Sequence, residues 1–214
     1  MASEPPLTTD GETGVEPVVV LGGCLSSPGF YREMCGAIRR LRNCSVEVAD
    51  VWIWHWAAAG TARGWSRILD RLHESVLQKA ADSPTGKVVL VGHSAGGVIG
   101  RLYLSDQPFR GRTYAGLERV STLITLGSPH TNPERARLRR EVEQRLPGAF
   151  FAPQVRYVAV AGRAVSGKRD AGSSWRSAGW LSRHLVGHGE VWGAGLVPGE
   201  SALLEGAEEL GMDG

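Results

Sequence analysis

The chain has 214 residues, of which 42% are hydrophobic and 21% charged, and its formal net charge is +2 at pH 7. This length suits one domain with a sizeable core. The near balance of charges gives no reason to expect a nucleic acid or an anionic membrane surface as a partner. Apolar runs stay shorter than the roughly 18 residues that a transmembrane helix needs, so we expect no transmembrane segment.

The cysteines and the first residues indicate the compartment. Cys24, Cys35 and Cys44 are few and irregularly spaced, which is not typical of a disulfide framework and favours a reducing compartment. Residues 1–16 combine acidic residues with prolines and predict a disordered tail rather than a signal or transit peptide. We therefore expect a cytoplasmic protein with one domain at residues 17–214. The sequence does not determine its oligomeric state.

Strand and helix patterns alternate along the domain. The expected strands are residues 18–21, 45–51, 87–91, 120–126 and 155–161. The expected helices are residues 31–41, 64–81, 98–105 and 133–146, with a last one at 200–210. A stretch rich in glycine, serine and arginine follows the fifth strand. Alternation of this kind predicts an α/β fold with a mostly parallel sheet covered by helices on both faces.

The segment Gly-His-Ser-Ala-Gly at residues 92–96 lies between a predicted buried strand and a predicted helix. This is the setting of a nucleophile elbow, in which a strained turn presents a serine hydroxyl, here that of Ser94. The backbone N–H of Ala95 would then help to stabilise an oxyanion, with that of Cys24 (or Leu25) as second donor. The alternatives are a glycine-rich turn with an incidental serine, or Cys24 as nucleophile, for which no neighbouring base is evident.

Several segments together resemble lipase-like α/β-hydrolases. They are residues 18–25, VGHSAGG at 91–97, LITLGSPH at 123–130, WGAGLVP at 192–198 and ESALL at 200–204. The resemblance is strongest to a plant, algal and cyanobacterial group, and weaker to relatives of lipases and GPI-inositol-deacylases. It implies the α/β-hydrolase fold and an esterase or lipase that uses Ser94 on small-molecule or lipid esters, without metal or organic cofactor. A plastid location is compatible with the resemblance, although no transit peptide is evident.

The sequence departs from this family at two catalytic positions. The family's acid is the aspartate of a G-D-G-(L/V/I)-V-P segment, and that position is Ala194 here. The family's catalytic histidine comes near the C-terminus, but no histidine follows His188, so we expect a truncated C-terminal end. Asp170 and His188 could substitute, because they keep the order serine, acid, histidine. The hypotheses are a truncated esterase, catalysis through these substitutes, and a non-catalytic binding protein; acyl transfer instead of hydrolysis also stays open.

The other histidines admit less specific interpretations. His93 is expected to pack and hydrogen-bond within the turn, with its side chain pointing away from that of the serine. His130, near the end of a strand, is expected to be structural or, less favoured, to face the substrate. His184 and His188 have the spacing of zinc ligands on a helix, but the glycines beside His188 and the lack of a third ligand argue against a metal site.

Tryptophans form two groups. Trp52, Trp54 and Trp56 alternate after the second predicted strand, and would share one side if that strand continued. They would then line an apolar cleft or belong to the core. Trp175 and Trp180 lie in the glycine-rich stretch and could contribute to a lipid-facing cap.

Overall fold

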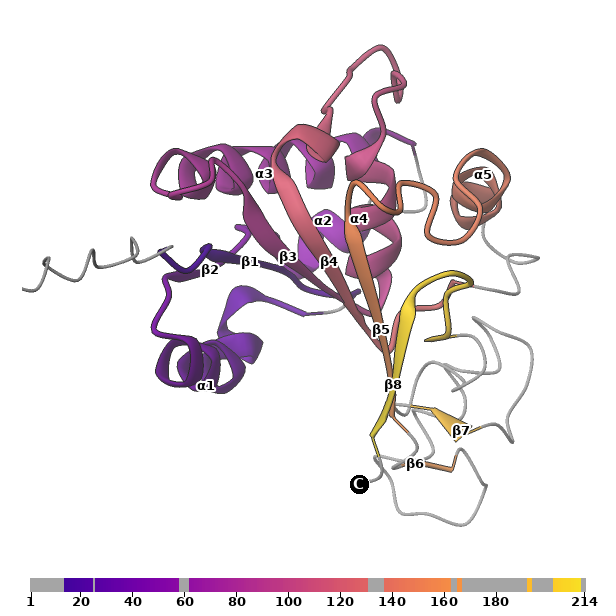
Figure 1. The fold of residues 1–214 in the computed structure, drawn as a ribbon. Coiled ribbons are helices and arrows are strands. Elements are labelled where there is room, and N and C mark those ends of the chain that lie inside the picture. Colours follow the sequence, from indigo (N-terminus) through magenta and orange to yellow (C-terminus); the bar gives the residue numbers. More distant parts are fainter. Residues whose placement is uncertain are drawn as a thin grey trace, which may run out of the picture.

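The structure, a computed structural model, describes residues 14–24, 26–57, 62–130, 137–162, 165–166, 192–193 and 202–212. Its centre is a six-stranded sheet in the order β2-β1-β3-β4-β5-β8, and every neighbouring pair in it is parallel (Figure 1). The strands are β1 (Val18–Leu21), β2 (Val46–Val48), β3 (Val88–His93), β4 (Val120–Leu126), β5 (Arg156–Gly162) and β8 (Glu208–Met212). Two short strands, β6 (Val165–Ser166) and β7 (Trp192–Gly193), form a separate antiparallel pair.

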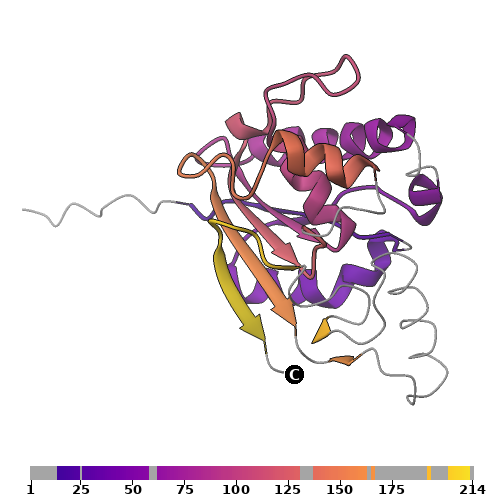
Figure 2. The ribbon, with the colours of Figure 1, turned by 90° about the vertical axis from the view of Figure 1, so that its right-hand side faces the viewer.

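Helices lie on both faces of the sheet, as the sequence predicts. The helical elements are η1 (Pro28–Tyr31), α1 (Arg32–Arg42), α2 (Ile53–Ala57), α3 (Ala62–Ala81), α4 (Ala95–Leu104), η2 (Gly116–Glu118) and α5 (Arg137–Arg145). Helix α1 covers one face, and α3, α4 and α5 lie on the opposite side (Figures 1 and 2). The expected α/β fold is therefore confirmed.

The sequence of β1 is continuously apolar because both faces of this strand are buried. Val18 and Val20 are buried in the cluster that includes Tyr31 and Cys35, on the α1 side. Val19 and Leu21 are buried in the larger cluster on the opposite face, which holds the apolar stripe of α3 and most of α4. Because successive side chains of a strand point to opposite faces, a strand covered by helices on both sides needs apolar residues at every position.

The prediction of a last helix at residues 200–210 is wrong: the described residues 203–207 form a loop and turn, and a strand follows them. Glu208–Met212 forms β8 and pairs with Val158–Gly162 of β5. Gly206 has a φ of +77°, which a right-handed helix does not allow. Arg156 also donates to both carboxylate oxygens of Glu208, at 2.8 and 2.6 Å. Pairing with the free edge of β5 satisfies backbone groups that would otherwise be exposed, and this outweighs the local helix preference.

The second strand does not continue through the three tryptophans. β2 ends at Val48, and residues 53–57 form α2. In this helical turn Trp56 points into the core and is 6% exposed, whereas Trp54 is 60% exposed and stacks on Trp52, with ring centroids 5.0 Å apart. Only Trp56 therefore belongs to the core. Trp175 and Trp180 lie outside the described residues.

A helix that crosses a lipid bilayer needs about 20 mostly apolar residues. None of the described helices is both long enough and apolar enough to cross a membrane.

Candidate active site

Strand β3 passes into helix α4 through a single residue, Ser94, whose backbone has φ +52° and ψ −125°. Left-handed φ values are costly for residues with a side chain and persist only where the surroundings impose them. Here the Ser94 N–H donates to the carbonyl of Leu126 at 2.9 Å, and the N–H of Gly97 donates to the carbonyl of Ser94 at 3.1 Å. The strained turn that the sequence predicts is present, and the role of Ser94 as nucleophile stays a prediction.

Glycines allow the turn to pack closely against its neighbours. A Cβ on Gly92 would lie 2.5 Å from the Cα of Gly97, and one on Gly96 would overlap the backbone carbonyl of Leu21. One on Gly97 would overlap the hydroxyl of Ser128. The turn therefore has no room for side chains at these three positions, and the end of β1 lies directly beside the first turn of α4.

The turn after β1 lies against Ser94. A Cβ on Gly23 would be 2.8 Å from the Cβ of Ser94. The N–H of Gly23 donates to the Tyr31 hydroxyl at 2.9 Å and so is already used. The next amide along the chain is that of Cys24, which agrees with the predicted oxyanion donor, while Leu25 lies outside the described residues. Ala95 is the first residue of α4, where N–H groups have no acceptor within the helix. The oxyanion roles of Cys24 and Ala95 stay predictions.

The side chain of Cys24 is not suited to act as a nucleophile itself. It is exposed to solvent, yet desolvation by the protein around it raises the pKa of its thiol to about 11, and the charge of Arg139 offsets this only in part. The reactive form of cysteine is the thiolate. At neutral pH Cys24 is therefore a protonated thiol.

Two described histidines lie close to the turn, and neither bonds to Ser94. The Nδ1 atom of His93 is 2.9 Å from the Tyr31 hydroxyl, and burial lowers the pKa of this imidazole. His130 is 2% exposed, and burial, with a smaller effect of the Arg101 charge, lowers its pKa to about 3. Both are neutral at pH 7. The His93 side chain bonds to Tyr31, which belongs to a different segment, and His130 contacts Arg101 and Thr125.

The other two described histidines belong to different parts of the fold. The Nδ1 atom of His73 is 3.0 Å from the hydroxyl of Tyr103. The Nδ1 atom of His55 accepts the N–H of Trp52 at 2.9 Å. The sequence has six histidines, so His184 and His188 are the two outside the described residues.

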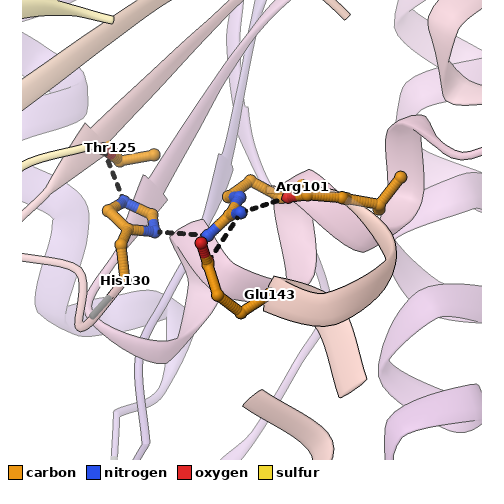
Figure 3. A network of polar contacts seen from close by, with 5 residues as sticks. Arg101, Thr125, His130 and Glu143 are labelled. Carbon is orange, nitrogen blue, oxygen red and sulfur yellow. Dashed lines mark hydrogen bonds and ion pairs between the residues drawn. The ribbon is translucent and has the colours of Figure 1, made fainter. Parts of the chain in front are cut away.

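A buried polar network joins α4, β4 and α5 (Figure 3). Arg101, which is 2% exposed, donates to a carboxylate oxygen of Glu143 at 2.9 Å and to the carbonyl of Leu146. His130 lies 3.4 Å from the same guanidinium through Nδ1 and 3.1 Å from the hydroxyl of Thr125 through Nε2. Sequence reasoning missed Arg101. The available signal was a single arginine in the otherwise apolar helix Ala95–Leu104.

The topology of the sheet shows where the side chains of a catalytic acid and base would lie. His93 at the end of β3 is in register with Leu126, Leu126 with Val160, and Gly162 at the end of β5 with Met212 at the end of β8. The carboxyl ends of these parallel strands therefore lie at one edge of the sheet, where ligands bind in such folds. The predicted Asp170 and His188 lie outside the described residues, as does Ala194, which the sequence resemblance aligns with a catalytic acid.

A metal site in a protein needs several ligand side chains close together. In the part of the chain that the structure describes, no three histidine, cysteine, aspartate or glutamate side chains are grouped so that they could hold a metal ion.

The sheet order, the helices on both faces and the strand-serine-helix turn are those of an α/β-hydrolase fold. More particularly, residues 66–144, from within α3 to within α5, match the family described as the PGAP1-like alpha/beta domain. A search of curated proteins gave no match.

Three solved structures are among those to which the chain is similar. A putative hydrolase of the alpha/beta superfamily from Xanthomonas campestris is 14% identical, with a TM-score of 0.48, over 94% of this chain and 87% of that one. Tomato methylketone synthase I is 15% identical, with a TM-score of 0.39, over 61% and 47%. A pyrethroid hydrolase from Sphingobium faniae is 21% identical, with a TM-score of 0.37, over 56% and 44%. The matches thus span less than half of the last two proteins.

Proposed function

We propose that this protein is a serine hydrolase of carboxylic esters, with Ser94 as the nucleophile. The observation that carries the proposal is the backbone of Ser94, which has φ +52° at the carboxyl end of a central parallel strand. Such strain at a serine favours a functional role over an incidental one. The side chain of Ser94 is half-buried.

The proposed reaction has two steps. The Oγ atom of Ser94 attacks the ester carbonyl carbon while its proton passes to a base, and the carbonyl oxygen becomes an oxyanion next to the N–H groups of Ala95 and Cys24. The oxyanion collapses, the C–O bond to the alcohol breaks, and the alcohol leaves with the proton from the base. Water then attacks the acyl-enzyme in the same way, which releases the carboxylic acid and restores Ser94.

His188 is the proposed base, with Asp170 as its acid. The four described histidines all have hydrogen-bond partners other than Ser94. The order Ser94, Asp170, His188 is also that of α/β-hydrolases.

Labelling with a fluorophosphonate tests the nucleophile. We expect one probe per chain by intact mass, on Ser94, and no adduct in Ser94→Ala. An unlabelled wild-type protein, or equal labelling of Ser94→Ala, would refute the proposal. Hydrolysis of p-nitrophenyl esters with short and long acyl chains then gives the preferred substrate length.

The base is tested with a matched pair of histidine variants. We expect His188→Ala to lower kcat on the order of 10³-fold or more, since triad histidines contribute this much in other serine hydrolases. His184→Ala, four residues away, should have little effect. Unchanged activity in His188→Ala would eliminate this residue as base.

A second function is favoured by one observation, namely that alanine occupies the family's acid position at residue 194. A methyl group cannot orient an imidazole, and loss of the acid costs on the order of 10⁴-fold in turnover in a serine protease. On this alternative the protein is a non-catalytic binding module, and it would neither react with fluorophosphonate nor hydrolyse esters. A gain of turnover in Ala194→Asp would show that the family's acid position is still functional here.

A further inference from the structure

The hydroxyl of Tyr31 joins the two segments that form the candidate site. It accepts the N–H of Gly23 at 2.9 Å, lies 2.9 Å from Nδ1 of His93, and donates to the hydroxyl of Ser26 at 3.1 Å. The ring is 7% exposed and meets the His93 ring edge-on, with centroids 5.7 Å apart. A Cβ on Gly22 would be 2.6 Å from the Tyr31 ring, so the ring is packed directly against the turn after β1.

The direction of each hydrogen bond follows from the number of protons. Ser26 donates its hydroxyl proton to the carbonyl of Gly23 at 2.7 Å, so its oxygen accepts from Tyr31. Tyr31 has one hydroxyl proton, which this bond uses. The contact with His93 therefore requires a proton on Nδ1 of the imidazole, donated to the tyrosine oxygen. The network is then satisfied when Nδ1 of His93 carries a proton, as it does in the neutral Nδ1–H tautomer.

We infer that Tyr31 is a positioning residue for the oxyanion site, an inference that rests on the proposed function. Its hydroxyl binds Gly23, which directly precedes Cys24, and His93, which directly precedes Ser94. One oxygen atom thus fixes the residue before the proposed oxyanion donor and the residue before the proposed nucleophile. β1 and β3 are separate segments of the chain that pair in the sheet. The hydrogen bonds of Tyr31 therefore add to this pairing in fixing the distance between the proposed oxyanion donor and the proposed nucleophile.

The accuracy with which oxyanion donors must be placed indicates how far kcat should fall when the Tyr31 hydroxyl is removed. Oxyanion donors work at about 2.7–3.1 Å from the developing charge, and a misplacement of about 1 Å can cost on the order of 10²-fold in rate. The turn would keep part of its geometry without Tyr31, since Ser26 also holds the Gly23 carbonyl through its N–H at 3.3 Å. We therefore expect loss of the hydroxyl to lower kcat roughly 10-fold to 100-fold, with KM changed less than about 2-fold, because the substrate is not contacted.

The test compares Tyr31→Phe with Tyr103→Phe. Both remove the hydroxyl of a buried tyrosine that bonds to a histidine Nδ1, but Tyr103 bonds to His73, which belongs to α3 on the far side of β1 from Tyr31. We expect fluorophosphonate labelling and kcat to fall in Tyr31→Phe and to match the wild type in Tyr103→Phe. In ¹⁵N NMR spectra, the Nδ1–H of His93 should be visible in the wild type and lost or shifted only in Tyr31→Phe.

The outcomes separate this inference from the proposed function. A labelled wild type with an equal labelling rate in Tyr31→Phe would overturn the positioning role and leave the nucleophile intact. An unlabelled wild type would overturn both. If Tyr31→Phe does not fold, Ser26→Ala provides the second test, because it removes the bond from the Ser26 hydroxyl to the Gly23 carbonyl and should lower kcat in the same direction. Unchanged kcat in Ser26→Ala would then count against the inference.

Discussion

The buried charge of Arg101 leads to a clear prediction about the free energy of unfolding. Its side chain is 2% exposed, and its guanidinium lies 2.9 Å from the carboxylate of Glu143, the acidic partner that the described part of the chain provides. A guanidinium stays protonated in proteins and cannot escape its burial by losing a proton. We therefore expect Glu143→Gln to destabilise the protein strongly, because it removes the counter-charge and leaves the shape of the side chain nearly unchanged.

The magnitude follows from the surroundings of the pair. Removing one partner of a fully buried ion pair costs about 3–5 kcal/mol. Here the Glu143 side chain is 32% exposed, and the carbonyl of Leu146 still accepts from Arg101, so part of the charge stays compensated. We expect a loss of about 2–3 kcal/mol in the free energy of unfolding, which corresponds to roughly 5–10 °C in Tm for a chain of this size.

Urea unfolding followed by circular dichroism measures this loss, and α5 supplies the control. Glu141 pairs with Arg145 at 3.6 Å, and both side chains are more than a third exposed. Such a pair contributes about 0.3–0.5 kcal/mol, so Glu141→Gln should hardly change the urea midpoint. The double variant Arg101→Met with Glu143→Leu should recover most of the stability, because it removes the buried charge together with its partner. Equal midpoints for Glu141→Gln and Glu143→Gln would refute the reasoning.

Two further predictions concern pH and the packing of the turn. The pKa of His130 falls from 6.5 to about 3 on folding, through burial and the charge of Arg101, so the unfolded chain binds more protons between these values. Stability should therefore fall as pH drops from about 6.5 towards 3, by up to about 1.4 kcal/mol per pH unit from this group, and His130→Asn should flatten that slope in urea titrations. Gly96→Ala should lower Tm and slow fluorophosphonate labelling, because its Cβ would overlap the carbonyl of Leu21; overpacking of this kind typically costs about 1–3 kcal/mol. Gly29→Ala, where a Cβ meets nothing within 4 Å, should leave both unchanged, and similar behaviour of the two variants would contradict the packing argument.

Local patterns in the sequence were enough to predict most of the fold. Buried strands such as β1 and β3 are continuously apolar, and α3 carries a clear apolar stripe, so that their type and approximate bounds follow from the residues themselves. The strained turn at Ser94 could also be predicted, because a small residue is needed wherever a strand enters a helix without a loop, and the glycines around this serine meet that need.

Tertiary structure decided the features that depend on residues far apart in the chain. The segment at β8 has a weak local preference, and the free edge of β5 makes it a strand. Trp52 and Trp54 lie on the surface because β2 is short and a helical turn follows it. The contact of Tyr31 with His93 spans 62 residues of the sequence, and that of Arg101 with Glu143 spans 42. No local sequence pattern predicts either contact. Periodicity records which side of an element is buried, whereas the partner of a buried polar group is known only once the elements have packed together.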